Sequence, residues 1–294
     1  MADNTFDPDL YTRAGVITKS YYRDVYSTID PARTELSQAG KVTIVTGAGR
    51  GIGVGIAEAH AKSGVRGLVL VGRSPANVEK VKEEILTKYP SVDILTVGAD
   101  VADEKAVDHL FDMIRERFGA VDTLIHNAGL ITPNFDVVDK VSLSVWWNDF
   151  NVNAKGTFLV NAAFIRLAKQ NPALKLTVVN VVTNVNLEGP TLSSYLSSKA
   201  AVMKFTEVLQ AENPELAAYT LNPGIVNTDA ILEDFKPYAK DTPGLAGCVT
   251  AYLSAKRPDY LKGRHLIVNW DMDELEARKE EIQNSDMLKL GLKI

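Results

Sequence analysis

Apolar runs of strand length alternate with segments of helical periodicity from residue 41 almost to the end of the 294-residue chain. The apolar runs are hydrophobic at nearly every position, which is typical of parallel strands covered on both faces. Each run is followed by an amphipathic helical pattern, the order that produces an α/β sheet. We therefore predict one doubly wound α/β domain with a parallel seven-stranded sheet and helices on both faces. The expected strands are "KVTIVTG", "GLVLVG", "DILTVGAD", "VDTLIHNAG", "LKLTVVNVV", "AAYTLNPG" and "RHLIVNW".

The two ends of the chain differ from this alternating region. Residues 1–40 are polar and tyrosine-rich, lack a sustained period and end in "IDPARTELSQAG", which is typical of a loop. We predict an N-terminal arm over 1–40 and a cofactor-binding catalytic domain over 41–294, with a short charged helix at "DELEARKEEI". Within the domain, "NVNAKGTFLVNAAFIRLAKQ" predicts a long helix, and Ser74 with Pro75 predicts a capped helix start.

Composition excludes several classes of protein. A formal net charge of −5 gives no basic footprint for nucleic acid or an anionic membrane. No apolar run approaches the roughly 18–20 residues of a membrane-spanning helix, and the first residues do not resemble a secretory signal. The single cysteine, Cys248, rules out an internal disulfide framework and fits a reducing compartment. These features predict a soluble, cytoplasmic protein.

The first expected strand and helix are joined by "TGAGRGIG", residues 46–53. Glycines in such a loop let the backbone turn tightly and approach a bound pyrophosphate, and the next helix offers free N–H groups and the positive end of its dipole. A lone glycine pattern also suits an ordinary tight turn, but its place between a strand and a helix indicates a dinucleotide site. The predicted contacts here are Gly47, Gly49, Arg50, Gly51, Ile52 and Gly53.

The choice between NAD(H) and NADP(H) depends on the end of the second strand. A carboxylate for the ribose hydroxyls is expected there in an NAD site, but the sequence has Gly72 and Arg73. A guanidinium suits the 2′-phosphate of NADP, which Arg50 could also approach. We therefore predict NADP(H) in preference to NAD(H); the alternative is that both arginines are solvated surface charges. Asp100, followed by Val101, would accept a hydrogen bond from the adenine amine or else cap the next helix.

Tyr195 precedes Lys199 by four positions in "SSYLSSKAAVMKF", which has helical periodicity. Positions i and i+4 lie on the same face of a helix. A protonated Lys199 would favour the phenolate and lower the pKa of Tyr195 from its reference value of about 10. Such a tyrosine can give a proton to a carbonyl oxygen or take one from an alcohol. The spacing is common by chance, but this segment lies at the carboxyl end of the sheet, where cofactors bind.

Together these segments resemble the short-chain dehydrogenase/reductase superfamily, whose members have a Rossmann fold. The motifs occur in that family's order and spacing and cover residues 41 to about 270: "TGAGRGIG", "HNAG", "NVNAKG", "YLSSK" and "NPG". The arm "RDVYSTIDPARTELSQAGK" and the tail "NWDMDELEARKEEI" resemble a fungal branch of these enzymes. The resemblance is specific for the family and much less specific for the substrate.

The resemblance implies roles for individual residues. Tyr195 would be the general acid/base, Lys199 would bind the nicotinamide ribose and lower the tyrosine pKa, and Asn153 would hold a water molecule of a proton relay. Asn153 could also be an ordinary helix-turn asparagine. No metal site is implied. The other implied cofactor contacts are Asn127, Ala128 and Gly129, which would also brace the sheet, and Pro223, Gly224, Val226 and Thr228, which would border the nicotinamide.

Thr183 occupies the position where the family normally has serine, whose hydroxyl would polarise the substrate carbonyl. Threonine keeps that hydroxyl donor. Its extra methyl group stiffens the side chain and takes space beside the reacting carbon. The departure therefore affects the expected rate and substrate size more than the reaction type. Asn184 and Asn186 follow closely and could supplement or replace this donor.

The sequence predicts an NADPH-dependent carbonyl reductase, or the reverse alcohol dehydrogenase, that acts on a small-molecule carbonyl or alcohol. Its expected role is in fungal secondary metabolism. Two alternatives stay open because a fold does not fix a function. One is a cyclase, isomerase or dehydratase on the same scaffold without net redox, and the other is a non-catalytic NADP(H)-binding protein.

The segment 228–243 is expected to cover the part of the pocket that binds the substrate. The alternative is that it packs down as an ordinary loop. Its apolar and aromatic residues suit a mainly apolar ketone. Trp146 and Trp147 would border the pocket or, more simply, pack in the core or between subunits. The resemblance implies a homodimer or homotetramer through helices at about 152–169 and 195–211, and the arm could cross to a neighbouring subunit. The residues expected to face the substrate are Ile231, Leu232, Phe235 and Tyr238.

Overall fold

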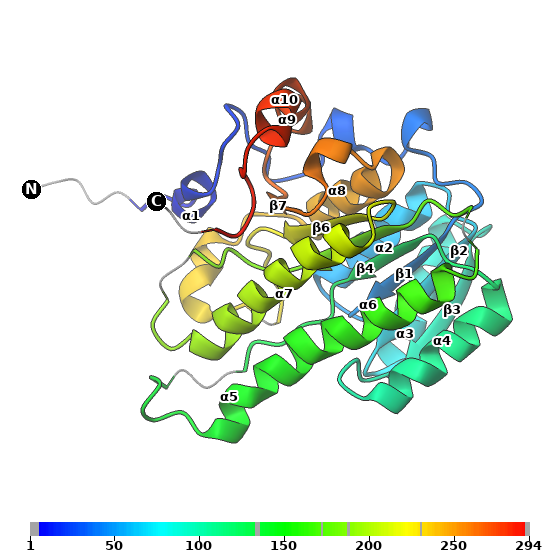
Figure 1. The fold of residues 1–294 in the computed structure, drawn as a ribbon, viewed down its shortest axis with the longest axis horizontal. Coiled ribbons are helices and arrows are strands. Elements are labelled where there is room, and N and C mark those ends of the chain that lie inside the picture. Colours follow the sequence, from blue (N-terminus) through cyan, green and yellow to red (C-terminus); the bar gives the residue numbers. More distant parts are fainter. Residues whose placement is uncertain (1–5, 133–135, 172, 187–188, 230, 292–294) are drawn as a thin grey trace, which may run out of the picture.

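Seven parallel strands form one sheet in the order β3-β2-β1-β4-β5-β6-β7 in the computed structural model of the chain (Figure 1). The structure describes residues 6–132, 136–171, 173–186, 189–229 and 231–291. All residues of β1, β4 and β5 are buried, which explains why aliphatic residues predominate in them. The predicted doubly wound seven-stranded sheet is confirmed. The strands are β1 Val42–Thr46, β2 Gly67–Gly72, β3 Asp93–Gly98, β4 Thr123–His126, β5 Thr177–Val181, β6 Ala217–Asn222 and β7 Arg264–Ile267.

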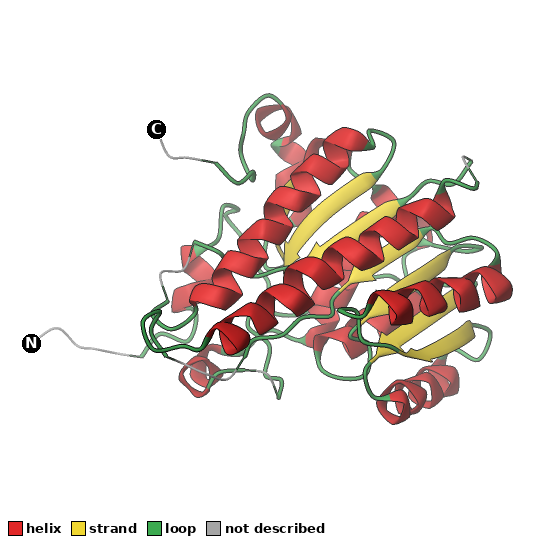
Figure 2. Cartoon of the chain, turned by 60° about the horizontal axis from the view of Figure 1, so that its bottom comes forward, coloured by secondary structure: helices red, strands yellow, loops and turns green. Residues whose placement is uncertain are grey.

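Helices cover both faces of the sheet (Figures 1 and 2). Successive strand residues point to opposite faces, so Val45 belongs to the core under one helical layer and Ile44 to the core under the other. The first layer consists of α2 (Ile52–Lys62), α3 (Pro75–Lys88) and α8 (Pro243–Lys256). The second consists of α4 (Glu104–Phe118), α6 (Gly156–Ala168) and α7 (Ser193–Glu212), with α5 (Leu143–Phe150) extending beyond the sheet.

The strand order reverses at the centre of the sheet. Strand β1 pairs with β2 on one side and with β4 on the other, and Thr46 lies opposite His126 in the register of the second pair. The chain therefore winds outward in opposite directions from β1 and β4. Loops leaving the carboxyl ends of these two strands separate there and create the crevice where α/β proteins bind ligands.

Two predicted helices differ from the structure. The long helix expected from residue 151 is preceded by α5, and the two are joined through a π-turn at Asn151–Lys155. The charged C-terminal helix is divided into α9 (Met272–Ala277) and α10 (Lys279–Gln283), because Arg278 leaves the helical conformation with φ −102° and ψ 14°. The helix start at Ser74 and Pro75 is confirmed: the Ser74 side chain accepts a hydrogen bond from the N–H of Asn77.

The N-terminal arm packs against the α/β domain of the same chain, beside the C-terminal helices (Figure 1). It contains α1 (Leu10–Ala14) and two 3₁₀ turns, Ser27–Ile29 and Thr34–Leu36. The Trp270 indole N–H donates to the carbonyl oxygen of Gly15 over 2.8 Å, and the N–H of Tyr22 donates to the carbonyl of Asn269 over 2.9 Å. Hydrogen bonds of this kind attach the arm to the segment that follows β7.

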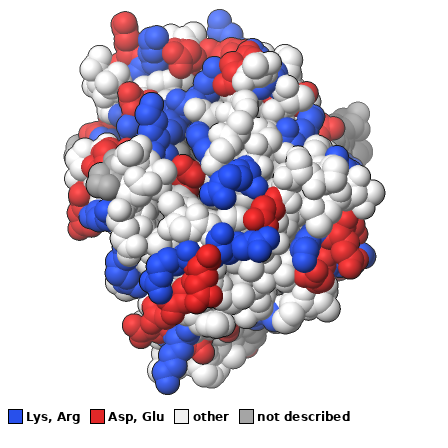
Figure 3. All heavy atoms as spheres, turned by 90° about the vertical axis from the view of Figure 1, so that its right-hand side faces the viewer, with Lys and Arg blue, Asp and Glu red and all other residues white. Residues whose placement is uncertain are grey.

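Charges of both signs are mixed over the face of the molecule turned forward in Figure 3. Opposite charges on α3, α4 and β3 form ion pairs, such as Arg117–Asp93 and Lys82–Glu79 at 2.7 Å each, and neutralise each other within each pair. Among the described side chains, this face therefore has no extended basic surface of the kind that binds a nucleic-acid backbone. In the described ranges, no helix has both the length and the apolar character needed to cross a bilayer.

Candidate active site

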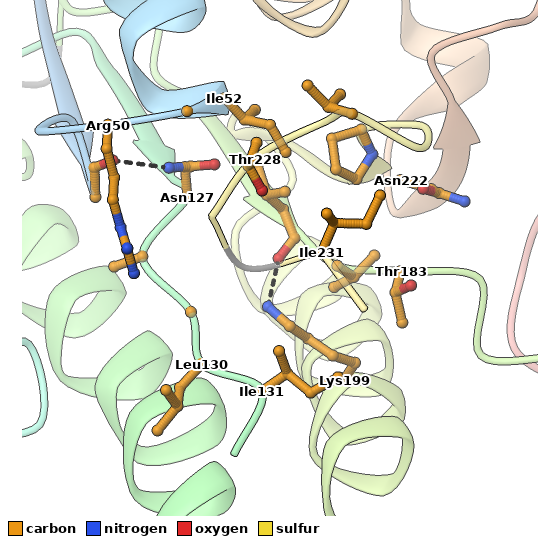
Figure 4. A pocket seen from close by; sticks show the side chains of 18 of the residues that line it. Arg50, Ile52, Asn127, Leu130, Ile131, Thr183, Lys199, Asn222, Thr228 and Ile231 are labelled. Atoms are coloured by element: carbon orange, nitrogen blue, oxygen red, sulfur yellow. Dashed lines mark hydrogen bonds between the residues drawn. The ribbon is translucent and has the colours of Figure 1, made fainter. Parts of the chain in front are cut away.

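A cavity of about 780 Å³ opens at the carboxyl ends of the strands. Arg50 and Ile52 of the glycine loop lie at one side of it, Thr183 and Lys199 lie at the other, and Thr228 projects between them (Figure 4). Of the predicted catalytic and cofactor-binding residues, all line the cavity except Gly53 and Asn153, which are buried. The fold thus brings together residues from positions 47 to 228 of the sequence.

The glycine loop has the geometry of a phosphate-binding turn. Gly47 and Gly51 have φ values of +66° and +56°, in the left-handed region that favours glycine. A Cβ atom on Gly53 would lie 2.1 Å from the carbonyl oxygen of Gly47, so α2 can approach the loop this closely only with glycine there. No side chain caps the N-terminus of α2, which leaves its first N–H groups for an anion. These residues fit the pyrophosphate of a dinucleotide.

Two exposed arginines border the same end of the cavity. Arg73 directly follows β2, and among the described residues it has no ion-pair partner. Arg50 Nη1 lies 3.5 Å from a carboxylate oxygen of Asp229, but both side chains are exposed, so solvent screens this pair. Both guanidinium groups are therefore accessible to a ligand phosphate, and neither is committed to a buried structural role.

Asp100 lies at the rim of the cavity after β3. Its Oδ1 atom accepts a hydrogen bond from the N–H of Ala102 over 2.9 Å. The side chain that caps α4 is instead that of Asp103, which accepts from Lys105 and Ala106. The alternative in which Asp100 caps the helix is thus wrong, whereas its contact with the adenine amine stays a prediction.

Tyr195 lies in the first turn of α7 and faces Thr183, which follows β5 by two residues. Burial raises the pKa of Tyr195 above its ordinary value, and a hydrogen bond with the Thr183 hydroxyl opposes part of that shift. The phenol is therefore protonated at neutral pH. Both hydroxyl groups line the cavity, and each has one O–H that it can donate to an oxygen atom bound between them.

Lys199 lies one helical turn after Tyr195, with a side chain that is almost fully buried. Its ammonium group donates a 3.0 Å hydrogen bond to the carbonyl oxygen of Val181, at the end of β5 (Figure 4). Burial lowers the pKa of Lys199 to about 8, against the attraction of the Asp149 carboxylate. The expectation that Lys199 lowers the tyrosine pKa is not met in this structure, because desolvation of the phenol outweighs other influences on it.

Asn153 is fully buried in the π-turn between α5 and α6. Its amide group exchanges two hydrogen bonds of 2.8 Å with the backbone of Leu130 and donates a third, of 2.9 Å, to the Ser198 hydroxyl. In the wider π-turn, Asn153 thus links the loop after β4 to α7, the helix that carries Lys199, through these hydrogen bonds. Such turns are frequent at functional sites. Its role in a water relay stays a prediction.

A buried carboxylate, Asp149, was not among the predicted site residues. The Thr132 N–H and hydroxyl donate to its Oδ1 atom over 3.0 and 2.6 Å, and the Ser194 hydroxyl donates to its Oδ2 atom over 2.6 Å. Only about 1% of Asp149 is exposed, yet it influences the pKa values of both Tyr195 and Lys199. The available signal was an acidic residue inside the aromatic stretch "VWWNDF".

The loop after β4 braces the sheet and closes the floor of the cavity. The Asn127 amide donates to the carbonyl oxygens of Thr46 and Gly47, each over 3.2 Å, which ties β4 to the glycine loop. A Cβ atom on Gly129 would lie 3.0 Å from the Lys199 ammonium nitrogen. A side chain at this position would therefore crowd the ammonium group of Lys199 and displace it by a few tenths of an ångström.

Several residues around the site have other positions than the sequence suggested. Trp146 and Trp147 do not line the cavity; the Trp146 indole N–H donates to Ser193 over 3.1 Å, and half of Trp147 is exposed. Asn184 lines the cavity, but Asn186 does not, and its N–H donates to Asn184 Oδ1 over 3.1 Å. Asn186 is therefore not placed to replace the Thr183 hydroxyl.

The end of the cavity beyond Thr183 is largely apolar. Ile231, Leu232 and Phe235 line it, as expected for the segment 228–243, whose residue 230 lies outside the described residues. Tyr238 does not line the cavity. Additional apolar walls, which the sequence did not indicate, come from Ile131, Leu192, Leu196 and Ile267.

Comparison with known proteins assigns the chain to a family. The sequence model of the short chain dehydrogenases matches residues 41–238. The chain belongs to the short-chain dehydrogenase family. The curated short chain dehydrogenase andI of Emericella variicolor is 32% identical over 94% of this chain and 96% of its own length. The short chain dehydrogenase pigC of Monascus ruber is 30% identical over 93% of each chain.

Solved structures share the same fold. A 3-ketoacyl-(acyl-carrier-protein) reductase from Brucella melitensis, complexed with NADH, is 28% identical, with a TM-score of 0.71 over 79% of this chain and 97% of that protein. A short-chain type dehydrogenase/reductase from Mycobacterium marinum gives a TM-score of 0.72 at 22% identity, covering 80% of this chain and 96% of that one. The family membership predicted from the motifs is confirmed.

The matched segment of this short-chain dehydrogenase starts after the arm, but the arm reaches the cavity. Tyr11, Thr12 and Gly15, from α1 and the residue that follows it, contribute to the cavity wall. This contact was not predicted from the sequence. No signal in the sequence could have found it, because the arm and the segment it meets are more than 200 residues apart.

Proposed function

We propose that this short-chain dehydrogenase is an NADPH-dependent carbonyl reductase, or alcohol dehydrogenase in the reverse direction, acting on a mainly apolar ketone or aldehyde. The observation that carries the proposal is the meeting of Thr183 and Tyr195 on one cavity wall, where Thr183 is close enough to influence the tyrosine pKa. Lys199 follows one turn later, and an uncapped helix N-terminus lies across the cavity. This set can hold a dinucleotide beside a proton donor, which binding alone would not require.

When bound, NADPH supplies the hydride that reduces a carbonyl carbon. Tyr195 gives its phenolic proton to the carbonyl oxygen as negative charge develops there, and Thr183 donates a hydrogen bond to the same oxygen. Lys199 binds the nicotinamide ribose and keeps a positive charge near the phenol. Asn153 holds the water molecule through which the site regains a proton. Pro223, Gly224, Val226 and Thr228 border the nicotinamide.

The preference for NADP(H) is supported by Arg73 and Arg50 at the adenosine end of the cavity. Two guanidinium groups can bind a 2′-phosphate with charge-assisted hydrogen bonds. A structurally similar reductase is complexed with NADH, so the family alone does not decide this choice. The proposal therefore depends on the two arginines of this chain.

Two further properties are part of the proposal. Two copies of the chain pair through α6 and α7, where Phe158 and Val208 expose 55% and 45% of their surface. Light scattering after gel filtration would give the mass of a dimer or tetramer; a monomer at micromolar concentration would refute it. The enzyme is located in the cytoplasm, as its single, unpaired Cys248 suggests. Its metabolic role is in fungal secondary metabolism.

A fluorescence titration with NADPH and, separately, with NADH tests the cofactor assignment. We expect NADPH to bind at least about tenfold more tightly, corresponding to about 1.4 kcal/mol from contacts with the 2′-phosphate. Tighter NADH binding would refute the preference and leave the dehydrogenase assignment standing. Binding of neither would refute both.

A second measurement follows NADPH absorbance while ketones and aldehydes of increasing size are supplied. Oxidation of NADPH with formation of the alcohol supports the reductase. Conversion of a carbonyl substrate without loss of NADPH would instead identify a cyclase, isomerase or dehydratase. Comparing product and cofactor amounts in one reaction separates these outcomes.

A further inference from the structure

The N-terminal arm places an aromatic ring at the substrate end of the cavity. Tyr11, from α1, lines the cavity together with Phe235. Their ring centroids are 5.1 Å apart, and the Tyr11 ring also meets the edge of Tyr238 with centroids 4.7 Å apart. Distances in this range are those of favourable aromatic pairs. The three rings form a continuous cluster, of which Tyr11 and Phe235 face the cavity.

A network of charged groups fixes the arm in this position. Arg23 pairs with Asp9 over 3.0 Å and with Asp241 over 2.9 Å, and it donates to the carbonyl oxygen of Tyr238 over 2.7 Å. The Asp241 side chain is fully buried and also accepts a 2.7 Å hydrogen bond from Asn269. Arg23 therefore binds the arm and the segment around Tyr238 to the same buried carboxylate.

The part of the wall formed by the arm offers mainly apolar contact. The Thr12 hydroxyl accepts a hydrogen bond from Arg23, so this acceptor is already used within the protein. The neighbouring lining residues Ile231, Leu232 and Ile267 are aliphatic. The two ring planes are inclined by 42°, so a substrate that reaches this wall gains most from an apolar ring that stacks on one of them and contacts the other obliquely.

We propose that Tyr11 is a specificity-determining residue, which together with Phe235 forms an aromatic wall for planar fused-ring carbonyl compounds. This inference rests on the proposed function, because it assigns a substrate class to the same site. A small aliphatic ketone held at Thr183 and Tyr195 has no ring to pack against this wall, so we expect the wall to contribute little to its binding. The arm thus favours large, flat substrates over small ones.

The test compares the binding of two ketones, 2-acetylnaphthalene and butanone, by calorimetry with NADP⁺ present. Binding is measured without turnover, so it does not depend on the catalytic step. In Tyr11→Ala we expect 2-acetylnaphthalene to bind about fivefold to tenfold more weakly, as for the loss of an aromatic pair, with butanone unchanged. Tyr11→Leu, which keeps apolar bulk without a ring, should show the same selective loss, whereas Tyr11→Phe should bind like the unaltered chain.

Leu10→Ala is the matched control, because Leu10 is the neighbouring α1 residue and is half exposed. It should change neither ketone, and NADPH binding should be equal in all variants. An equal loss for both ketones, no loss for either, or no binding of 2-acetylnaphthalene to the unaltered chain would overturn the inference. Failure of the unaltered chain to oxidise NADPH would refute the proposed function instead, and the selective loss of ketone binding would still stand.

Discussion

Ser194 donates a 2.6 Å hydrogen bond to the buried carboxylate of Asp149, and the next residue in the chain is Tyr195. The first turn of α7 is therefore attached to the end of α5 through a charged group. The same carboxylate attracts the ammonium group of Lys199 and raises its pKa against the larger effect of burial. Asp149 thus acts on the site through both position and charge.

The first prediction concerns the pH dependence of carbonyl reduction. The pKa of Lys199 is lowered from 10.5 to about 8, so its positive charge is present below that pH and lost as the pH rises through it. The raised pKa of Tyr195 keeps the proton donor intact over the same range, and His126, whose pKa burial lowers to about 3, stays neutral. We expect kcat/KM for reduction to fall above about pH 8.

Asp149→Asn should move this fall to lower pH, because the ammonium group loses the charge that supports it. Thr132→Val is the control: it removes one hydrogen bond to Asp149 but keeps the charge, so it should leave the position of the fall unchanged. The measurement is a pH profile of kcat/KM for each protein. An unmoved profile in Asp149→Asn would show that Asp149 has only a structural role.

The second prediction is that Tyr195→Phe loses turnover and keeps the cofactor. Removing a positioned general acid typically costs about 100-fold to 10,000-fold in rate. The phenyl ring still fills the space of the phenol, so the NADPH dissociation constant and the midpoint of thermal unfolding should stay near those of the unaltered protein. Retained turnover would remove Tyr195 from the mechanism.

The third prediction separates the hydroxyl of Thr183 from its methyl group. Thr183→Ser keeps the donor and removes the methyl group, so activity should stay equal or rise. Thr183→Ala removes the donor and should lower kcat about 100-fold or more, as for loss of an oxyanion-stabilising donor. Steady-state kinetics on one ketone measure both. Equal activity in all three proteins would make Thr183 a spectator.

The fourth prediction concerns Arg73. Arg73→Ala should weaken NADPH binding about tenfold or more, since hydrogen bonds to charged groups contribute about 1.5–3 kcal/mol, and should leave NADH binding unchanged. Lys80→Ala, at an exposed position of α3, controls for a general loss of positive charge. If both cofactors weaken equally, Arg73 contacts a part that they share.

The strands and the dinucleotide loop could be predicted because their causes are local in the sequence. The consecutive buried positions of β5 are filled mainly by valine, and the positive φ angles of Gly47 and Gly51 favour glycine. Tyr195 and Lys199 are separated by one helical turn, so helical periodicity alone places them on one face. These features hold regardless of how the distant parts of the chain pack.

The features that escaped prediction depend on tertiary packing. The signal for Asp149, its place in the aromatic stretch "VWWNDF", does not reveal the hydrogen-bond donors that surround its buried carboxylate. Similarly, the aromatic contact between Tyr11 and Phe235 joins residues that are 224 positions apart in the sequence. The direction of the tyrosine pKa was missed because it depends on how deeply the phenol is buried, which outweighs the charge of a neighbour.

The arm is synthesised before the strands of the sheet, whereas hydrogen-bond partners of the arm such as Asn269 and Trp270 follow β7. A nascent chain can form the strands β1 to β5 and the helix of Tyr195 while the arm still has nowhere to dock. The outer wall of the cavity is therefore completed only when the ribosome has released the C-terminal segment. A chain that ends before residue 269 would retain the glycine loop but would lack the residues to which the arm is hydrogen-bonded.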